Sequence, residues 1–126
     1  MQTVSRSVLV LLGWGLLATA IPASAHHSFA MYDLTKTQSI EGTVKEYQWT
    51  NPHAWIYVTV PAADGKVVDY SIELTSPNLL MRRGWRPSSL KTGDKVTVVL
   101  NPLRDGTPGG RIVSVTTPDG KVLTER

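Results

Sequence analysis

The chain has 126 residues, the size of one ordinary domain. Hydrophobic residues make up 41% and charged residues 18% of it, which excludes an intrinsically disordered chain. Its net charge is only +3, and the basic residues are scattered except at Arg82, Arg83 and Arg86, so we expect no nucleic-acid partner. The chain has no cysteine, which excludes disulfides, cysteine-ligated metals and thiol catalysis.

Residues 1–25 have the pattern of a secretory signal peptide. Arg6 lies in a short leading segment, an apolar run of 13 residues follows, and Ala23-Ser24-Ala25 supplies an Ala-x-Ala cleavage pattern. The apolar run is shorter than the roughly 20 residues that a membrane-spanning helix needs. We therefore expect cleavage before His26, a mature protein in the periplasm or secreted, and no membrane anchor after processing.

The mature chain, residues 26–126, is expected to form one β-rich domain. Segments rich in β-branched and aromatic residues, bounded by turn residues, predict strands at 39–49, 55–60, 67–74, 95–100 and 111–117. Gly42 is expected to mark a bulge or bend, and residues 105–110 a loop. Val122 and Leu123 extend the last strand as a terminal hairpin.

A short helix is predicted between the third and fourth strands. Ser76 is placed as its N-cap, Pro77 in its first position, residues 78–83 in its body and Gly84 at its end. Three strands, a helix and two strands are the order of an OB-fold, a small barrel closed at one end by the helix. We therefore expect an all-β fold with one short helix, a small OB-fold-like five-stranded barrel. A generic small β-sandwich is the alternative.

Aromatic residues are expected to supply much of the core area. They are Tyr32, Tyr47, Trp49, Trp55, Tyr57, Tyr70 and Trp85. Trp49, Trp55 and Tyr57 could instead form a stacking face for sugars or bases, as OB-folds often do.

Several motifs resemble those of a family of small exported bacterial proteins of unknown function. They are His26-His27-Ser28-Phe29-Ala30 after the signal peptide, Glu41-Gly42-x-Val44, Trp49-x-Asn51-Pro52-His53, Glu73, Gly84-Trp85 and Gly93-Asp94-x-Val96. The resemblance covers nearly all of the mature chain. It implies export and a β-rich fold, and it implies no activity.

The histidines point to a metal site. Cleavage before His26 would leave its free amine and ring Nδ1 able to chelate one ion together, and His53 or His27 would add a third nitrogen. This arrangement resembles the histidine brace of copper proteins, and three nitrogens suit Cu(II). Glu73 is expected to orient a metal-bound histidine by accepting its second ring proton.

Each of these residues also has a simpler interpretation. His26 and His27 could be exposed residues of a loose terminus, His53 could satisfy a turn, and Glu73 could face water. Asp33 is a weaker candidate oxygen ligand. Cleavage after Ser24 would instead create a Cu/Ni motif with histidine in the third position.

Two function classes follow from these observations. The first is an exported copper-binding protein that acts as a carrier or as an accessory to a periplasmic or membrane redox protein. The second is a non-enzymatic OB-type binding module for a glycan, a peptide or a partner protein. No hydrolase motif or phosphate-binding loop occurs. We therefore expect no enzyme, and an oxidase or monooxygenase using a brace copper is the least favoured interpretation.

Overall fold

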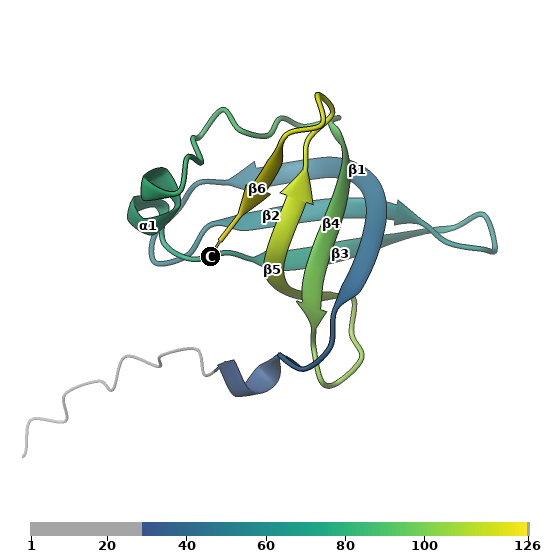
Figure 1. Ribbon diagram of the computed structural model, residues 1–126. Coiled ribbons are helices and arrows are strands. Elements are labelled where there is room, and N and C mark those ends of the chain that lie inside the picture. The colour runs from purple at the N-terminus through teal and green to yellow at the C-terminus, as the bar shows by residue number, and fades with distance from the viewer. Residues whose placement is uncertain (1–28, 126) are drawn as a thin grey trace, which may run out of the picture.

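The structure is a computed structural model that describes residues 29–125 (Figure 1). The predicted signal peptide, His26 and His27 lie outside the described residues. The elements, in chain order, are η1 (Phe29–Met31), β1 (Gln38–Gln48), β2 (Trp55–Pro61), β3 (Val67–Glu73), α1 (Pro77–Arg82), β4 (Lys95–Pro102), β5 (Gly109–Thr116) and β6 (Val122–Thr124). Within the described part of the chain, no helix is long and apolar enough to cross a membrane.

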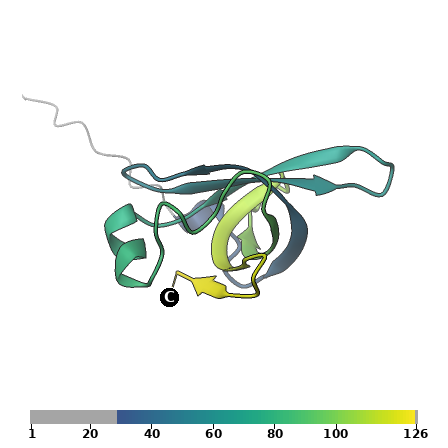
Figure 2. The same cartoon turned by 90° about the horizontal axis from the view of Figure 1, so that it is seen from above.

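Five of the strands close into a barrel. The sheet order is β3-β2-β1-β4-β5-β6, and a parallel pairing between β3 and β5 joins the two ends of the five-stranded part. The short strand β6 continues the sheet beyond β5. Figure 2 shows the curved barrel from above, with the β2–β3 hairpin and α1 extending to opposite sides. The predicted OB-fold-like barrel is thus confirmed, and the sandwich alternative is wrong.

Two glycines of β5 permit close approach of its neighbouring strands, Gly109 to β3 at the closure of the barrel and Gly110 to β4. A Cβ on Gly109 would lie 2.5 Å from the carbonyl oxygen of Ser71, and one on Gly110 would lie 2.2 Å from that of Asn101. Only residues without a side chain allow strands to approach so closely. Gly109 and Gly110 belong to β5, so the loop predicted at residues 105–110 is two residues too long at its end.

Gly42 has a related role, and its predicted bulge is wrong. Gly42 pairs in register with Val96, while the irregularity of β1 lies between Val44 and Glu46. A Cβ on Gly42 would lie 2.5 Å from the carbonyl oxygen of Thr59 on the neighbouring strand. Close approach of two strands, rather than an inserted residue, explains this glycine.

Helix α1 starts at Pro77, as predicted. Ser76 occupies the N-cap position, as predicted, although its side chain makes no capping hydrogen bond. Gly84 follows with a φ of +86°, a conformation that glycine adopts without steric cost. The chain then buries Trp85 completely, and its Nε1 donates to the carbonyl oxygen of Thr124 at 2.8 Å. Trp85 thereby ties the helical segment to β6.

The core lies inside the barrel and is built mainly from aliphatic residues such as Ile56, Val58 and Ile72. Of the seven aromatic residues expected there, Trp85 belongs to the core, and Tyr47, Trp49 and Tyr70 pack against it. Tyr32 is buried outside this cluster. Trp55 and Tyr57 do not join the core. Side chains alternate along β2, so Ile56 and Val58 face inward and these two rings face outward.

Candidate functional site

His53 and Glu73 are brought together by the pairing of β2 with β3. Glu73 ends β3 opposite Trp55, the first residue of β2, and His53 lies two residues before Trp55. Nδ1 of His53 makes a short hydrogen bond with Oε1 of Glu73. Glu73 is only 2% exposed, so its carboxylate needs partners of this kind.

Tyr32 is the second partner of the Glu73 carboxylate. Its buried hydroxyl donates a short hydrogen bond to Oε2, so one carboxylate contacts Tyr32 and His53 with its two oxygens. Burial, the hydrogen bond to Glu73 and the charge of that carboxylate raise the pKa of the Tyr32 hydroxyl far above its usual value near 10. We call Tyr32, Glu73 and His53 the carboxylate triad.

The carboxylate triad joins the beginning of the described chain to the barrel. Residues 30–36 run along the turn between β4 and β5, where Tyr32 forms a β-bridge with Leu103. Hydrogen bonds connect Asp33 to Pro102 and Met31 to Arg104 through backbone atoms, and Asn101 to the carbonyl of Lys36 through its side chain. This segment is therefore held firmly from Ala30 onward, and we call residues 29–36 the arm.

A buried ion pair lies beside the carboxylate triad. Arg111 is opposite Glu73 in the parallel β3–β5 pairing, and its guanidinium contacts the carboxylate of Glu125. The second oxygen of Glu125 accepts from the backbone N–H of Thr75 at 2.8 Å. The ring of Phe29 covers the guanidinium of Arg111 at 5.0 Å, a cation–π arrangement. Phe29 thus places the start of the arm next to Arg111, which is the backbone neighbour of Glu73 in the β3–β5 pairing.

Sequence reasoning identified only part of this cluster. It singled out His53 and Glu73, and the structure brings them into contact. It missed Tyr32 as a partner of Glu73, because residues 26–38 show no clear periodicity and tyrosine has an ordinary core interpretation. It also missed Arg111 and Glu125, which lie far from the histidines in the sequence and meet only through the barrel seam.

The remaining candidates lie elsewhere. The carboxylate of Asp33 lies at the surface, where it accepts a hydrogen bond from the Thr35 hydroxyl and forms an ion pair with Lys36. These contacts, the Thr35 hydroxyl first, lower the pKa of Asp33. Between residues 29 and 125, no three His, Cys, Asp or Glu side chains are arranged to hold a metal.

The three aromatic residues considered for a stacking face are divided. Trp49 packs edge-on against Tyr47, with ring centroids 5.8 Å apart, and joins the core margin. Trp55 and Tyr57 stack along the outer face of β2, with centroids 6.4 Å apart and planes 18° apart. Both rings are partly exposed.

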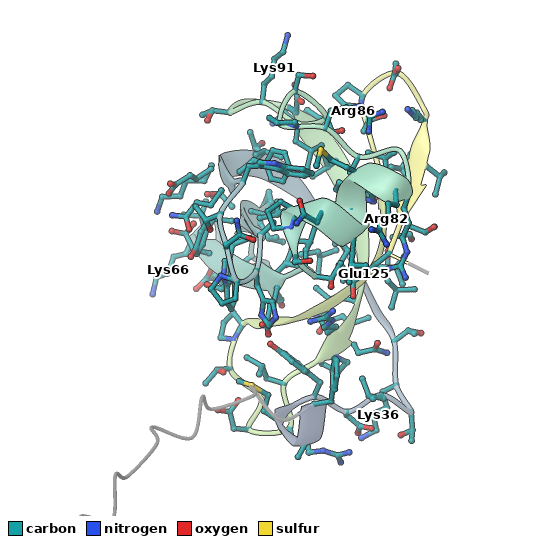
Figure 3. All side chains as sticks on the ribbon, turned by 90° about the vertical axis from the view of Figure 1, so that its left-hand side faces the viewer. Lys36, Lys66, Arg82, Arg86, Lys91 and Glu125 are labelled. Carbon is teal, nitrogen blue, oxygen red and sulfur yellow. The ribbon has the colours of Figure 1, made fainter. Side chains whose placement is uncertain are left out.

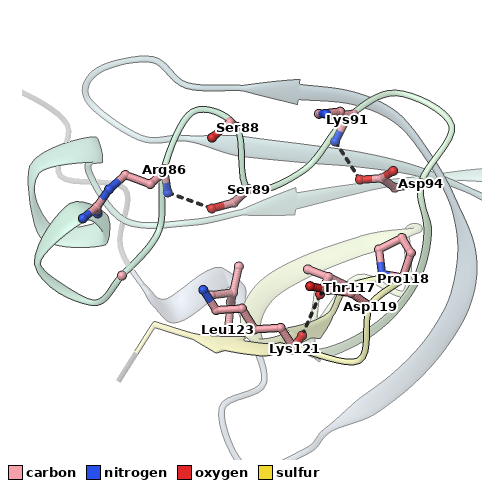
Figure 4. Close-up of a pocket in the computed structure, with 11 residues that line it drawn as sticks. Arg86, Ser88, Ser89, Lys91, Asp94, Thr117, Pro118, Asp119, Lys121 and Leu123 are labelled. Atoms are coloured by element: carbon pink, nitrogen blue, oxygen red, sulfur yellow. Dashed lines mark hydrogen bonds between the residues drawn. The ribbon is translucent and has the colours of Figure 1, made fainter.

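Arg82 and Arg86 lie near α1, and Lys36 lies at the opposite end of the molecule (Figure 3). Arg86 lines a polar cleft of about 400 Å³ together with Lys91 and Lys121. Two carboxylates in that cleft are already engaged within it, Asp94 by the backbone N–H of Lys91 and Asp119 by the hydroxyl of Thr117 (Figure 4). The Arg86 side chain donates to the carbonyl oxygens of Met81 and Trp85 at the end of the helix, which gives it a structural role.

The fold and the carboxylate triad define a small β-barrel protein with a buried, hydrogen-bonded carboxylate at its seam. The chain belongs to the family of unknown function DUF6152, whose model matches residues 13–112. No curated protein and no solved structure matches the chain.

Proposed function

We propose that this protein is an exported copper-binding protein. In this proposal, the amine and Nδ1 of His26 and the ring of His53 hold one Cu(II), with His27 as the alternative third ligand. The protein serves in the periplasm as a carrier or as an accessory to a redox protein. Bound copper would supply one-electron chemistry.

The contact between His53 and Glu73 carries this proposal. Histidines that bind metals usually donate their other ring N–H to a carboxylate or a carbonyl, which fixes the tautomer and the ring orientation. Nδ1 of His53 contacts Oε1 of Glu73, and Tyr32 holds that carboxylate from its other side. Nε2 of His53 is then the nitrogen that would bind an ion. The ring would be oriented by protein contacts before the ion arrives.

The place of the arm supports a role for His26. Phe29 is fixed over Arg111, and Arg111 pairs with Glu73 across the barrel seam. His26 precedes Phe29 by three residues, a chain length that spans at most about 11 Å. We propose that the amine of His26 lies at the same end of β3 after processing.

A competition titration tests the proposal. Cu(II) is titrated against a chelator into the processed protein, the same protein with three extra residues, Gly-Ser-Gly, before His26, and the variants His53→Gln and His53→Ala. Three residues are used because one or two would put a histidine in the third position and create the Cu/Ni motif. Glutamine keeps an amide that can donate to Glu73 but has no imidazole, so it separates loss of a ligand from loss of a structural contact. Lys66→Ala in the exposed hairpin is the control.

We expect the three-residue extension and both His53 variants to weaken Cu(II) binding at least tenfold, a loss of about 1.4 kcal/mol or more. The control should bind as the parent does. Affinities within about threefold of the parent, or about 0.7 kcal/mol, in all variants would refute the copper site.

A second candidate function rests on the outer face of β2. The stacked rings of Trp55 and Tyr57 form a flat, partly exposed aromatic surface suited to a sugar ring or another planar ligand. We propose glycan binding there as the alternative. Oligosaccharides should quench tryptophan fluorescence in the parent but not in Trp55→Ala; if no oligosaccharide changes the fluorescence, this alternative fails.

A further inference from the structure

A second surface lies between the arm and helix α1. A cleft of about 380 Å³ opens there. Its apolar walls are Phe29, Leu34, Leu79 and Ile112, its base includes Thr75, Arg111 and Glu125, and Arg83 also lines it. We call it the arm–helix cleft.

The apolar walls of the arm–helix cleft are unusually exposed. Phe29 is 57%, Leu34 46% and Leu79 41% exposed. The described residues include seven large hydrophobic side chains with such exposure, and three of them line this one cleft. Single exposed apolar residues are common on protein surfaces, whereas a gathered group marks an interaction site.

The charges of the arm–helix cleft define what it would accept. Its one carboxylate, that of Glu125, is already bound to Arg111 and to the backbone of Thr75. Arg83 is exposed and has no carboxylate partner within residues 29–125, and the same holds for its neighbour Arg82. The margin is therefore positive, and a partner that offers carboxylates would meet cations whose charge is not yet paired.

We propose that the arm–helix cleft docks a segment of a partner protein that carries a bulky apolar side chain flanked by carboxylates. The apolar side chain would rest between Phe29, Leu34 and Leu79, and a carboxylate would pair with Arg83. The exposed walls favour a protein segment, since a small ligand is usually enclosed over most of its surface. The proposal needs no copper.

Nuclear magnetic resonance with a defined peptide tests this surface. The ¹⁵N-labelled protein, purified from an exporting host without added metal, is titrated with a capped peptide in which one phenylalanine is flanked by glutamates. One control peptide has lysines for the glutamates, and another has alanine for the phenylalanine. Leu79→Ser and Arg83→Glu alter the cleft at exposed positions, so both should fold; Val67→Ser and Lys121→Glu are matched changes elsewhere.

The acidic phenylalanine peptide should shift the amide signals of Phe29, Leu79 and Arg83. Arg83→Glu and Leu79→Ser should each weaken binding at least about fivefold, and the two matched variants should not. Either control peptide binding equally well would overturn the proposal, as would shifts centred on Trp55 and Tyr57 or none at millimolar peptide. Signals of the cleft that move with protein concentration alone would show that a second copy of this chain occupies it instead.

Because these titrations contain no copper, their outcome is independent of the metal site. Peptide binding without copper binding would leave the docking surface intact and remove the proposed function. Copper binding without peptide binding would support the proposed function and overturn the docking surface.

Discussion

Nδ1 of His53 lies in hydrogen-bonding contact with the buried carboxylate of Glu73. A carboxylate only accepts hydrogen bonds, so the proton of this contact belongs on Nδ1 of the histidine. The pairing fixes which ring nitrogen a ligand can use. It is the structural basis of the proposed copper site.

This contact predicts an uncommon histidine tautomer. We expect neutral His53 to carry its proton on Nδ1, which long-range ¹H–¹⁵N correlation spectra of the imidazole report directly. Glu73→Gln should change the population of the two tautomers, because an amide can present either a donor or an acceptor to the ring. Protonation on Nε2 in the parent protein would contradict the contact.

Tyr32→Phe should destabilise the protein by about 1.5–3 kcal/mol, because Glu73 loses a buried hydrogen bond to a charged acceptor. Urea unfolding at neutral pH measures the loss. Tyr57→Phe is the matched control, since the Tyr57 ring lies on the outer face of β2, and should change stability by less than about 0.5 kcal/mol. Equal effects of the two substitutions would contradict the assigned role of Tyr32.

Tyr32 also predicts an alkaline limit to stability. Its folded pKa is raised, so above pH 10 the unfolded chain releases the tyrosine proton while the folded chain keeps it. The contribution of Tyr32 is thus constant below about pH 9 and is lost as the pH rises, with a slope approaching about 1.4 kcal/mol per pH unit. Tyr32→Phe should flatten this decline, and an unchanged slope would contradict the raised pKa.

The close approach of β5 to β4 at Gly110 predicts a large loss of stability when a single methyl group is added. Gly110→Ala places a Cβ 2.2 Å from the carbonyl oxygen of Asn101, so β4 and β5 must separate. We expect a loss of about 3 kcal/mol or more, or failure to fold. Gly106→Ala, in open space with a φ of +77°, should cost only about 1–2 kcal/mol for its backbone conformation. Urea unfolding measures the stability of both variants. Similar losses of stability in Gly110→Ala and Gly106→Ala would contradict the close approach of β4 and β5.

Much of the fold could be predicted because the residue types that favour strands and turns are recognised locally. The aromatic and β-branched residues Trp55, Ile56, Tyr57 and Val58 predict β2 without any knowledge of its neighbours. Which face is buried depends on the whole barrel, so the outward position of Trp55 and Tyr57 could not be predicted from large apolar side chains alone. The role of Gly110 likewise depends on a strand that precedes it by several residues and folds back against it.

The part of the candidate site that could be predicted from the sequence is the part that residue type alone indicates. Histidine before a strand and a carboxylate in the next strand suggested an oriented ring, and His53 does contact Glu73. The remaining members of the cluster come from the arm and from β5, and only the parallel closure of β3 on β5 places Arg111 beside Glu73. Long-range pairings of this kind leave no mark in a local sequence pattern.

Processing of the chain is a separate prediction. Intact mass spectrometry of protein purified from an exporting host should show that it begins at His26, because Ala23-Ser24-Ala25 follows a short apolar run. A chain that retains residues 1–25 would have no free amine at His26. Such a result would remove the amine from the proposed ligand set, whatever the role of His53.

The most direct test of the copper site is electron paramagnetic resonance of the processed protein with one equivalent of Cu(II). Hyperfine couplings should show three nitrogen ligands, with one imidazole lost in His53→Gln and the amine lost when Gly-Ser-Gly precedes His26. Glu73→Gln should keep all three nitrogens and alter their couplings, because it changes the partner of the His53 ring. A spectrum that is identical in the processed protein, the extended protein and His53→Gln would contradict a copper site built on His26 and His53.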